Sequence, residues 1–179
     1  MNHFALTIVG RDRPGIVSQV TEILFNQGCN LADSSCSILG GQFAMILILG
    51  HPGFTSRESF GDAFKPLEEA DLTVALRVLK PGGELRPHIE GELCMISVYG
   101  SDKPGIVYRV AQVLGDKQVN ITDLNTKLVG TDQRPVYVLV LEATLPEGVE
   151  EDQVNAWLAP VREELQVDIS VRTIPTVEL

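Results

Sequence analysis

A motif that occurs twice is the feature that most constrains how this chain folds. The segment GRDRPGIV at positions 10–17 returns 90 positions later as GSDKPGIV at positions 100–107. At this shift, 11 of the 31 positions from Gly10 to Gly40 are identical to their counterparts. A period of 90 residues is too long for a solenoid repeat and suits a complete small domain. The chain is therefore predicted to consist of two copies of one module.

Composition and charge exclude several classes of protein. Apolar residues make up 44% of the chain and charged residues 21%, a balance typical of globular domains. No apolar run has the length needed to cross a bilayer, and the first residues lack the pattern of a signal peptide, so we expect a cytoplasmic protein without membrane contact. The net charge is −10, and no basic patch is evident in the sequence. Such a chain is repelled by phosphate backbones, so direct nucleic-acid binding is not expected.

Residues that commonly carry catalysis or metal binding do not form recognisable motifs. The three cysteines, Cys29, Cys36 and Cys94, form no C-x-x-C pair, so we interpret them as small buried residues of a reducing compartment. The three histidines have no metal-binding spacing, and no serine lies in a Gly-x-Ser-x-Gly frame. The sequence therefore predicts no catalytic residue, no metal site and no cofactor.

Hydrophobic periodicity predicts the same order of elements in both copies. In the first copy we expect strands at 4–9, 29–39, 42–50 and 72–79, with a tight hairpin at Gly40 and Gly41. A first helix has Pro14 in its first turn and ends at Gly28, and a second, capped by Thr55 or Ser56, carries Phe60, Phe64 and Leu67. In the second copy we expect strands at 92–99, 119–129, 135–145 and 167–174, and helices at 104–117 and 150–165.

This order predicts an α+β fold. Right-handed crossovers fold strand-helix-strand-strand-helix-strand into a four-stranded antiparallel sheet with both helices on one face, the ferredoxin-like arrangement. The second and fourth strands then lie at the edges of each sheet, where exposed backbone groups favour pairing. We expect a first domain at 1–80, a linker at 81–90, a second domain at 91–175 and a tail at 176–179.

The repeated turn between the first strand and the first helix is the candidate binding site. It presents backbone N–H groups at the positive end of a helix, which suits a carboxylate. Gly15 removes a side chain there, and Asp12 is placed to receive an ammonium group. Asn30 follows the helix, and its carboxamide both donates and accepts hydrogen bonds. The equivalents in the second copy are Asp102, Gly105 and Asn120.

A purely structural interpretation of the same residues stays open. Asp12 followed by Pro14 is also an ordinary helix N-cap with a favourable proline in the first turn. Asn30 and Asp33 are residues that commonly hydrogen-bond the backbone of turns. The repetition does not decide between the two interpretations, because a turn needed for folding is repeated too.

The motifs together resemble a known family, the ACT domain. The resemblance rests on Asp-x-Pro-Gly-Ile-Val after a strand, followed by Gly-x-Asn-Leu/Ile-x-Asp about thirteen residues later. The second motif is complete at 28–33, whereas the second copy has Gln118 in place of its glycine. Arg11 against Ser101 is a further difference between the copies. Two such domains in this length and order resemble the glycine cleavage system transcriptional repressor family.

The resemblance implies a regulatory function without catalysis. ACT domains sense small molecules, most often amino acids, at interfaces between paired domains. It implies a small amino acid as ligand, with glycine as the candidate, a homodimer, and action through a DNA-binding activator protein rather than on DNA. The implied ligand-binding residues are Asp12, Gly15, Ile16, Asn30 and Leu31 in the first copy, and Asp102, Gly105, Ile106, Asn120 and Ile121 in the second.

Two other functions remain as alternatives. The chain is an assembly module without a ligand if its sheet edges and bare sheet faces only join other proteins. It is a stand-alone regulatory subunit of an amino-acid metabolic enzyme if a separate chain carries the catalytic residues.

Overall fold

The computed structural model describes residues 1–80, 91–131 and 134–174. The chain divides into two compact units, Met1–Pro87 and His88–Leu179. The linker predicted at 81–90 and the tail predicted at 176–179 lie outside the described residues. No helix among the described residues is both long and apolar enough to cross a membrane.

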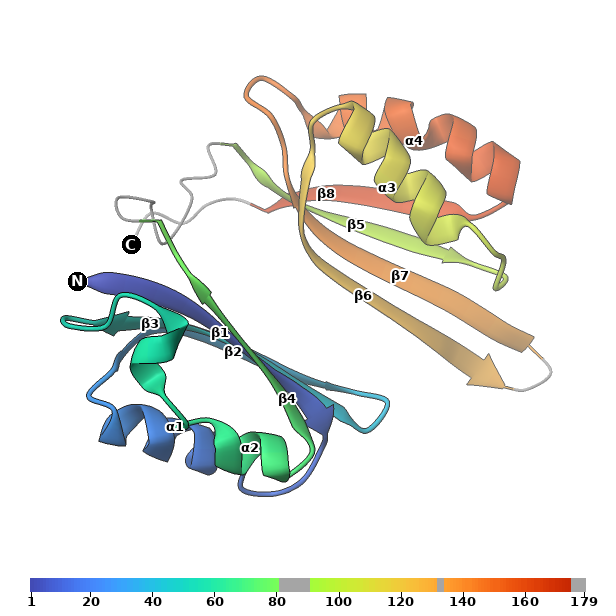
Figure 1. The fold of residues 1–179 in the computed structure, drawn as a ribbon. Helices are drawn as coiled ribbons and strands as arrows, with labels where there is room; N and C mark the ends of the chain where they lie inside the picture. Colours follow the sequence, from blue (N-terminus) through green and yellow to red (C-terminus); the bar gives the residue numbers. More distant parts are fainter. Residues whose placement is uncertain (81–90, 132–133, 175–179) are drawn as a thin grey trace. The chain divides into compact units, whose positions relative to one another are not determined.

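The first unit has the predicted ferredoxin-like fold. Its elements are β1 (Asn2–Arg11), α1 (Ile16–Asn26), β2 (Asn30–Leu39), β3 (Gln42–His51), the 3-10 helix η1 (Arg57–Phe60), α2 (Lys65–Glu69) and β4 (Leu72–Val78). The strands form one antiparallel sheet in the order β2-β3-β1-β4, with β2 and β4 at the edges as predicted. The helices cover one face of this sheet (Figure 1).

The second unit repeats this arrangement. Its elements are β5 (Leu93–Gly100), α3 (Ile106–Asp116), β6 (Asn120–Thr131), β7 (Arg134–Thr144), α4 (Glu151–Leu165) and β8 (Asp168–Ile174). The sheet order is β6-β7-β5-β8, so the two topologies are identical. Both α3 and α4 lie on one face of the sheet (Figure 1).

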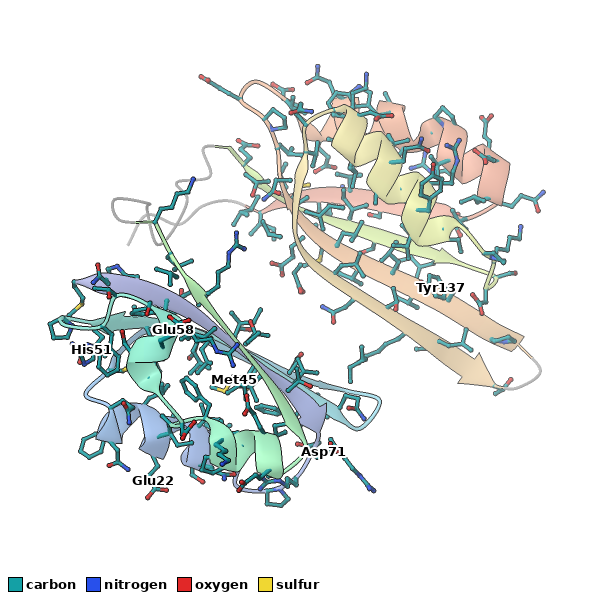
Figure 2. The ribbon with its side chains drawn as sticks, viewed as in Figure 1. Glu22, Met45, His51, Glu58, Asp71 and Tyr137 are labelled. Atoms are coloured by element: carbon teal, nitrogen blue, oxygen red, sulfur yellow. The ribbon has the colours of Figure 1, made fainter. Side chains whose placement is uncertain are left out.

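Alternating side chains place the core of the first unit between its sheet and its helices. Phe4, Leu6 and Ile8 of β1 are fully buried, and Met45 of β3 points toward the helices (Figure 2). The helix α1 contributes its own apolar face, Ile16, Val20 and Leu24. Residues two apart in a strand and three or four apart in a helix share one face, so these spacings produce a single apolar layer.

The first helix of each unit starts later than predicted. Pro14 was expected in the first turn, but α1 begins at Ile16 because Gly15, the N-cap, adopts the left-handed conformation with φ of 91°. Gly105 does the same before α3, with φ of 97°. A left-handed residue cannot continue a right-handed helix backward, so Pro14 remains in the preceding turn. The interpretation of Asp12 as the N-cap is therefore wrong.

The second helical segment of the first unit is divided into two short pieces. Ser56 caps η1 through a capping box with Ser59, and the chain then turns at Gly61 before α2 begins. Pro66 lies at the start of α2, where its missing N–H removes no helical bond, rather than kinking a longer helix. The apolar residues predicted on this segment, Phe60, Phe64 and Leu67, are all buried as expected.

The edge strand β2 is uncovered on both faces. All ten of its residues are exposed within this chain, as are those of β6 except the partly exposed Ile121. The prediction that all three cysteines are buried is therefore wrong for Cys36, which lies on β2 and is exposed. Cys94 is buried and Cys29 is partly buried. A pocket is lined by the first turn of α1 and the end of β2.

Candidate functional site

The turn before α1 is held by backbone hydrogen bonds and leaves the start of the helix uncapped by a side chain. The Asp12 N–H donates to the Gly41 carbonyl at 2.9 Å, which joins this turn to the β2–β3 hairpin. The Ser18 hydroxyl donates to the Gly15 carbonyl at 2.9 Å. None of the described side chains caps α1, and the first N–H groups of a helix have no acceptor within it. The backbone at Ile16 and Val17 is therefore suited to a negatively charged group.

A pocket of about 490 Å³ opens at this helix end. Its lining comes from the β1–α1 turn, the first turn of α1, the end of β2 and the start of β3. The lining residues are Asp12, Arg13, Gly15, Ile16, Val17, Ser18, Cys36, Ser37, Ile38 and Phe43. Three of the predicted site residues, Asp12, Gly15 and Ile16, thus lie together around one cavity. We call this cavity the α1 pocket.

Asn30 and Leu31 lie at the opposite end of the sheet from the α1 pocket. Asn30 pairs with Gly50 at the start of β2, whereas Ile38, beside the pocket, pairs with Phe43 near its end. At about 3.3 Å per residue, the eight positions between Asn30 and Ile38 span roughly 26 Å. Within one unit, the two groups of predicted residues therefore do not meet, and their role as a single site stays a prediction.

Sequence reasoning missed the two residues that form the far wall of the α1 pocket, Ile38 and Phe43. Their signal was present in the hairpin at Gly40 and Gly41. A two-residue turn makes Leu39 and Gln42 partners, and it therefore makes Ile38 and Phe43 partners on the next rung. Because Phe43 is buried toward the helices, Ile38 shares that face and closes the pocket.

The equivalent turn of the second unit is tied to α4. Lys103, the counterpart of Arg13, donates from Nζ to the Leu165 carbonyl at 2.9 Å and lies 3.4 Å from Oε1 of Gln166. Arg13 instead donates to Oε1 of Gln19 on its own helix at 2.9 Å. Asp102 and Gly105 precede α3, Ile106 begins it, and Asn120 and Ile121 begin β6. Like Asn30, Asn120 lies at the far end of its edge strand.

An ion pair also joins α3 to α4. Arg109 donates to both carboxylate oxygens of Glu164, with its Nη2 at 2.6 Å from Oε2. These hydrogen bonds and the charge of the guanidinium lower the pKa of Glu164. The same hydrogen bonds and the charge of the carboxylate raise the pKa of Arg109. No cluster of metal-binding side chains occurs among the residues that the structure describes.

Comparison with known proteins shows what this chain is similar to. The family model for the ACT domain matches residues 2–75 and again residues 92–172. The glycine cleavage system transcriptional repressor of Escherichia coli (strain K12) is 24% identical over 154 residues, covering 86% of this chain and 80% of the relative. A UPF0237 protein of Methanococcus maripaludis is 37% identical over 78 residues, covering 44% of this chain and 84% of the relative.

A solved structure extends the similarity over the whole chain. The crystal structure of an unknown protein from Galdieria sulphuraria is 25% identical, has a TM-score of 0.81, and covers 97% of this chain and 99% of that one. The family model, the repeated ferredoxin-like fold and the repeated glycine turn all indicate two copies of the same domain. The chain therefore belongs to the ACT domain family, with two ferredoxin-like ACT domains in tandem, and resembles the glycine cleavage system transcriptional repressor.

Proposed function

We propose that this ACT-domain regulatory protein senses a small amino acid in the α1 pocket of its first domain. The observation that carries the proposal is the pocket itself, about 490 Å³, which combines a helix N-terminus with Asp12 and Gly15. The ligand carboxylate accepts hydrogen bonds from the backbone at the start of α1, and Asp12 receives the ammonium group. Glycine is the first amino acid to test, because the Escherichia coli relative is a repressor of the glycine cleavage system.

A homodimer formed through β2 brings Asn30 and Leu31 of one copy close to Asp12, Gly15 and Ile16 of the other. The edge strand β2 is exposed, and among the strands that the structure describes it pairs with β3 along one side, which leaves its other side for pairing with a second copy. Antiparallel pairing of two copies about the middle of β2 brings Leu31 of one copy opposite Ile38 of the other. Asn30 of the second copy then lies opposite Leu39 of the first, at the end of β2 next to the α1 pocket, and its carboxamide can both donate and accept hydrogen bonds at the edge of the site.

The regulatory signal in this proposal is a change in assembly rather than a chemical reaction. A ligand that bridges two copies shifts the population of the paired state only by its differential affinity for that state. A net charge of −10 opposes direct contact with DNA, so the output is contact with a DNA-binding activator protein. The protein itself carries out no catalysis in this proposal.

A ligand-free assembly module is the second candidate function. The exposed β2 and β6 edges favour it, because an edge strand pairs with another chain without needing a ligand. In that case dimer formation is independent of amino acids, and the α1 pocket has no effect on it.

Calorimetric titration of the full chain with the twenty amino acids tests the proposed function. We expect saturable binding of at least one amino acid, weakened by Asp12→Ala and Asn30→Ala. The matched variants Asp102→Ala and Asn120→Ala, at the equivalent positions of the second domain, leave binding to the first domain unchanged. If no amino acid binds while the protein remains dimeric, the sensing function is wrong and the assembly module is supported.

A further inference from the structure

The α1 pocket is lined by both apolar and polar residues. Ile16 and Phe43 line the pocket and are almost fully buried. Val17 and Ile38 also line it and leave 44% and 62% of their surface exposed. Asp12, Arg13, Ser18 and Ser37 are its polar residues, and Gly15 and Cys36 complete the lining. The cavity therefore offers polar groups to the ammonium and carboxylate groups of an amino acid and an apolar surface to its side chain.

Glycine leaves this apolar surface unused. A volume of about 490 Å³ exceeds what the few heavy atoms of glycine occupy, and pockets of roughly 300–1,000 Å³ hold much larger ligands. An apolar side chain gains affinity for each methylene that it removes from water. A charged side chain gains no such affinity from Val17 and Ile38, because these residues provide no partner for a charge.

We propose that the α1 pocket selects amino acids with an aliphatic side chain, such as leucine or valine, over glycine. This selectivity rests on the proposed function, since it concerns the same cavity. The backbone of the ligand binds the start of α1 and Asp12, and its side chain packs between Val17 on the helix and Ile38 on the edge strand. Ile38 is the residue that determines specificity, because it provides the exposed wall.

The second domain provides a matched position for the test. Leu128 on β6 is the counterpart of Ile38 on β2, 90 positions later, and its exposed fraction of 60% is close to the 62% of Ile38. Both side chains lie on an edge strand, so replacing either by serine removes exposed apolar surface without opening the core. Any effect specific to Ile38→Ser therefore reflects the α1 pocket rather than a general change in the protein.

The experiment is calorimetric titration of the full chain with leucine, valine, glycine, aspartate and lysine. We expect leucine to bind about tenfold more tightly than glycine, as its partly enclosed side chain predicts. Ile38→Ser weakens leucine binding about tenfold and leaves glycine binding unchanged, whereas Leu128→Ser changes neither. Glycine binding as tightly as leucine overturns the selectivity but leaves the sensing function intact. Absence of binding by every amino acid refutes the sensing function itself.

A measurement of mass in solution separates ligand selection from dimer formation. Light scattering during size-exclusion chromatography is run on the wild type and on Ile38→Ser. We expect the two proteins to have the same oligomeric state. If Ile38→Ser changes the oligomeric state and weakens leucine and glycine binding equally, Ile38 serves the interface between copies, and the selectivity is overturned.

Discussion

Replacing Gly10 by alanine is expected to destabilise the first domain because its added methyl group has no room. Gly10 pairs with Leu72 across the sheet, next to Asp71 in the turn between α2 and β4 (Figure 2). A Cβ at Gly10 lies 2.6 Å from Cδ2 of Leu72 and 2.9 Å from the Asp71 carbonyl oxygen. Leu72 is a core residue with only 3% of its surface exposed, so moving it disturbs the packing. The glycine that opens the repeated motif thus permits close approach of two backbone segments.

The expected size of the effect follows from two opposing contributions. Inserting a methyl group into a packed core costs about 1–3 kcal/mol. Alanine also restricts the unfolded chain, which stabilises the folded state by about 0.4–1 kcal/mol. With the middle of each range, the net loss in the free energy of unfolding is about 1 kcal/mol. For a domain of this size, each kcal/mol lowers the melting temperature by about 4–8 °C.

Urea unfolding of the full chain, followed by circular dichroism, measures this loss. Gly115→Ala is the control of opposite sign, because a Cβ at Gly115 has no heavy atom within 4 Å and the residue lies in α3. Alanine there raises the free energy of unfolding by about 0.5–1 kcal/mol. A Gly10→Ala protein at least as stable as the wild type would refute the argument from close approach.

Three further predictions concern other parts of the chain. Gln118 has φ of 60° where the first copy has Gly28 at 71°, so Gln118→Gly should stabilise by about 0.5–1 kcal/mol; an unchanged or lower free energy of unfolding contradicts this. In mass spectrometry after thiol alkylation at mildly basic pH, Cys36 should react first and Cys94 last, because burial and the Glu151 carboxylate raise the pKa of Cys94 to about 11; equal rates contradict this. The lowered pKa of Glu164 means that its pair with Arg109 stabilises the fold above pH 4.5, the ordinary glutamate pKa, and stops doing so as pH falls through the lowered pKa. Glu164→Gln should therefore reduce the loss of stability on acidification, and an unaltered pH profile contradicts the pair's contribution.

The sheet topology was predictable because each strand carries its own periodic pattern and the whole pattern occurs twice. Phe4, Leu6 and Ile8 alternate with less buried residues in β1, and α1 repeats apolar residues at helical spacing. Such local patterns determine which face of each element is buried. Right-handed crossovers then leave few ways to connect the elements.

Other features depend on backbone conformation or on contacts that no short pattern records. The start of α1 depends on the left-handed conformation of Gly15. The sequence around Gly15 is compatible with a turn and with a helix, so it does not predict this conformation. The exposure of Cys36 depends on which strands the helices cover. The separation of Asn30 from Gly15 follows from the length of β2, so a shared motif does not imply that its residues meet within one domain.

The central claim is that an amino acid binds in the α1 pocket of the first ACT domain. A heteronuclear NMR titration of the full chain with leucine and with glycine tests it most directly. We predict saturable shifts in the amide signals of Ile16, Val17 and Ser18, with smaller changes at the equivalent start of α3. Signals at the start of α1 that do not move under conditions where an amino acid binds would contradict the claim.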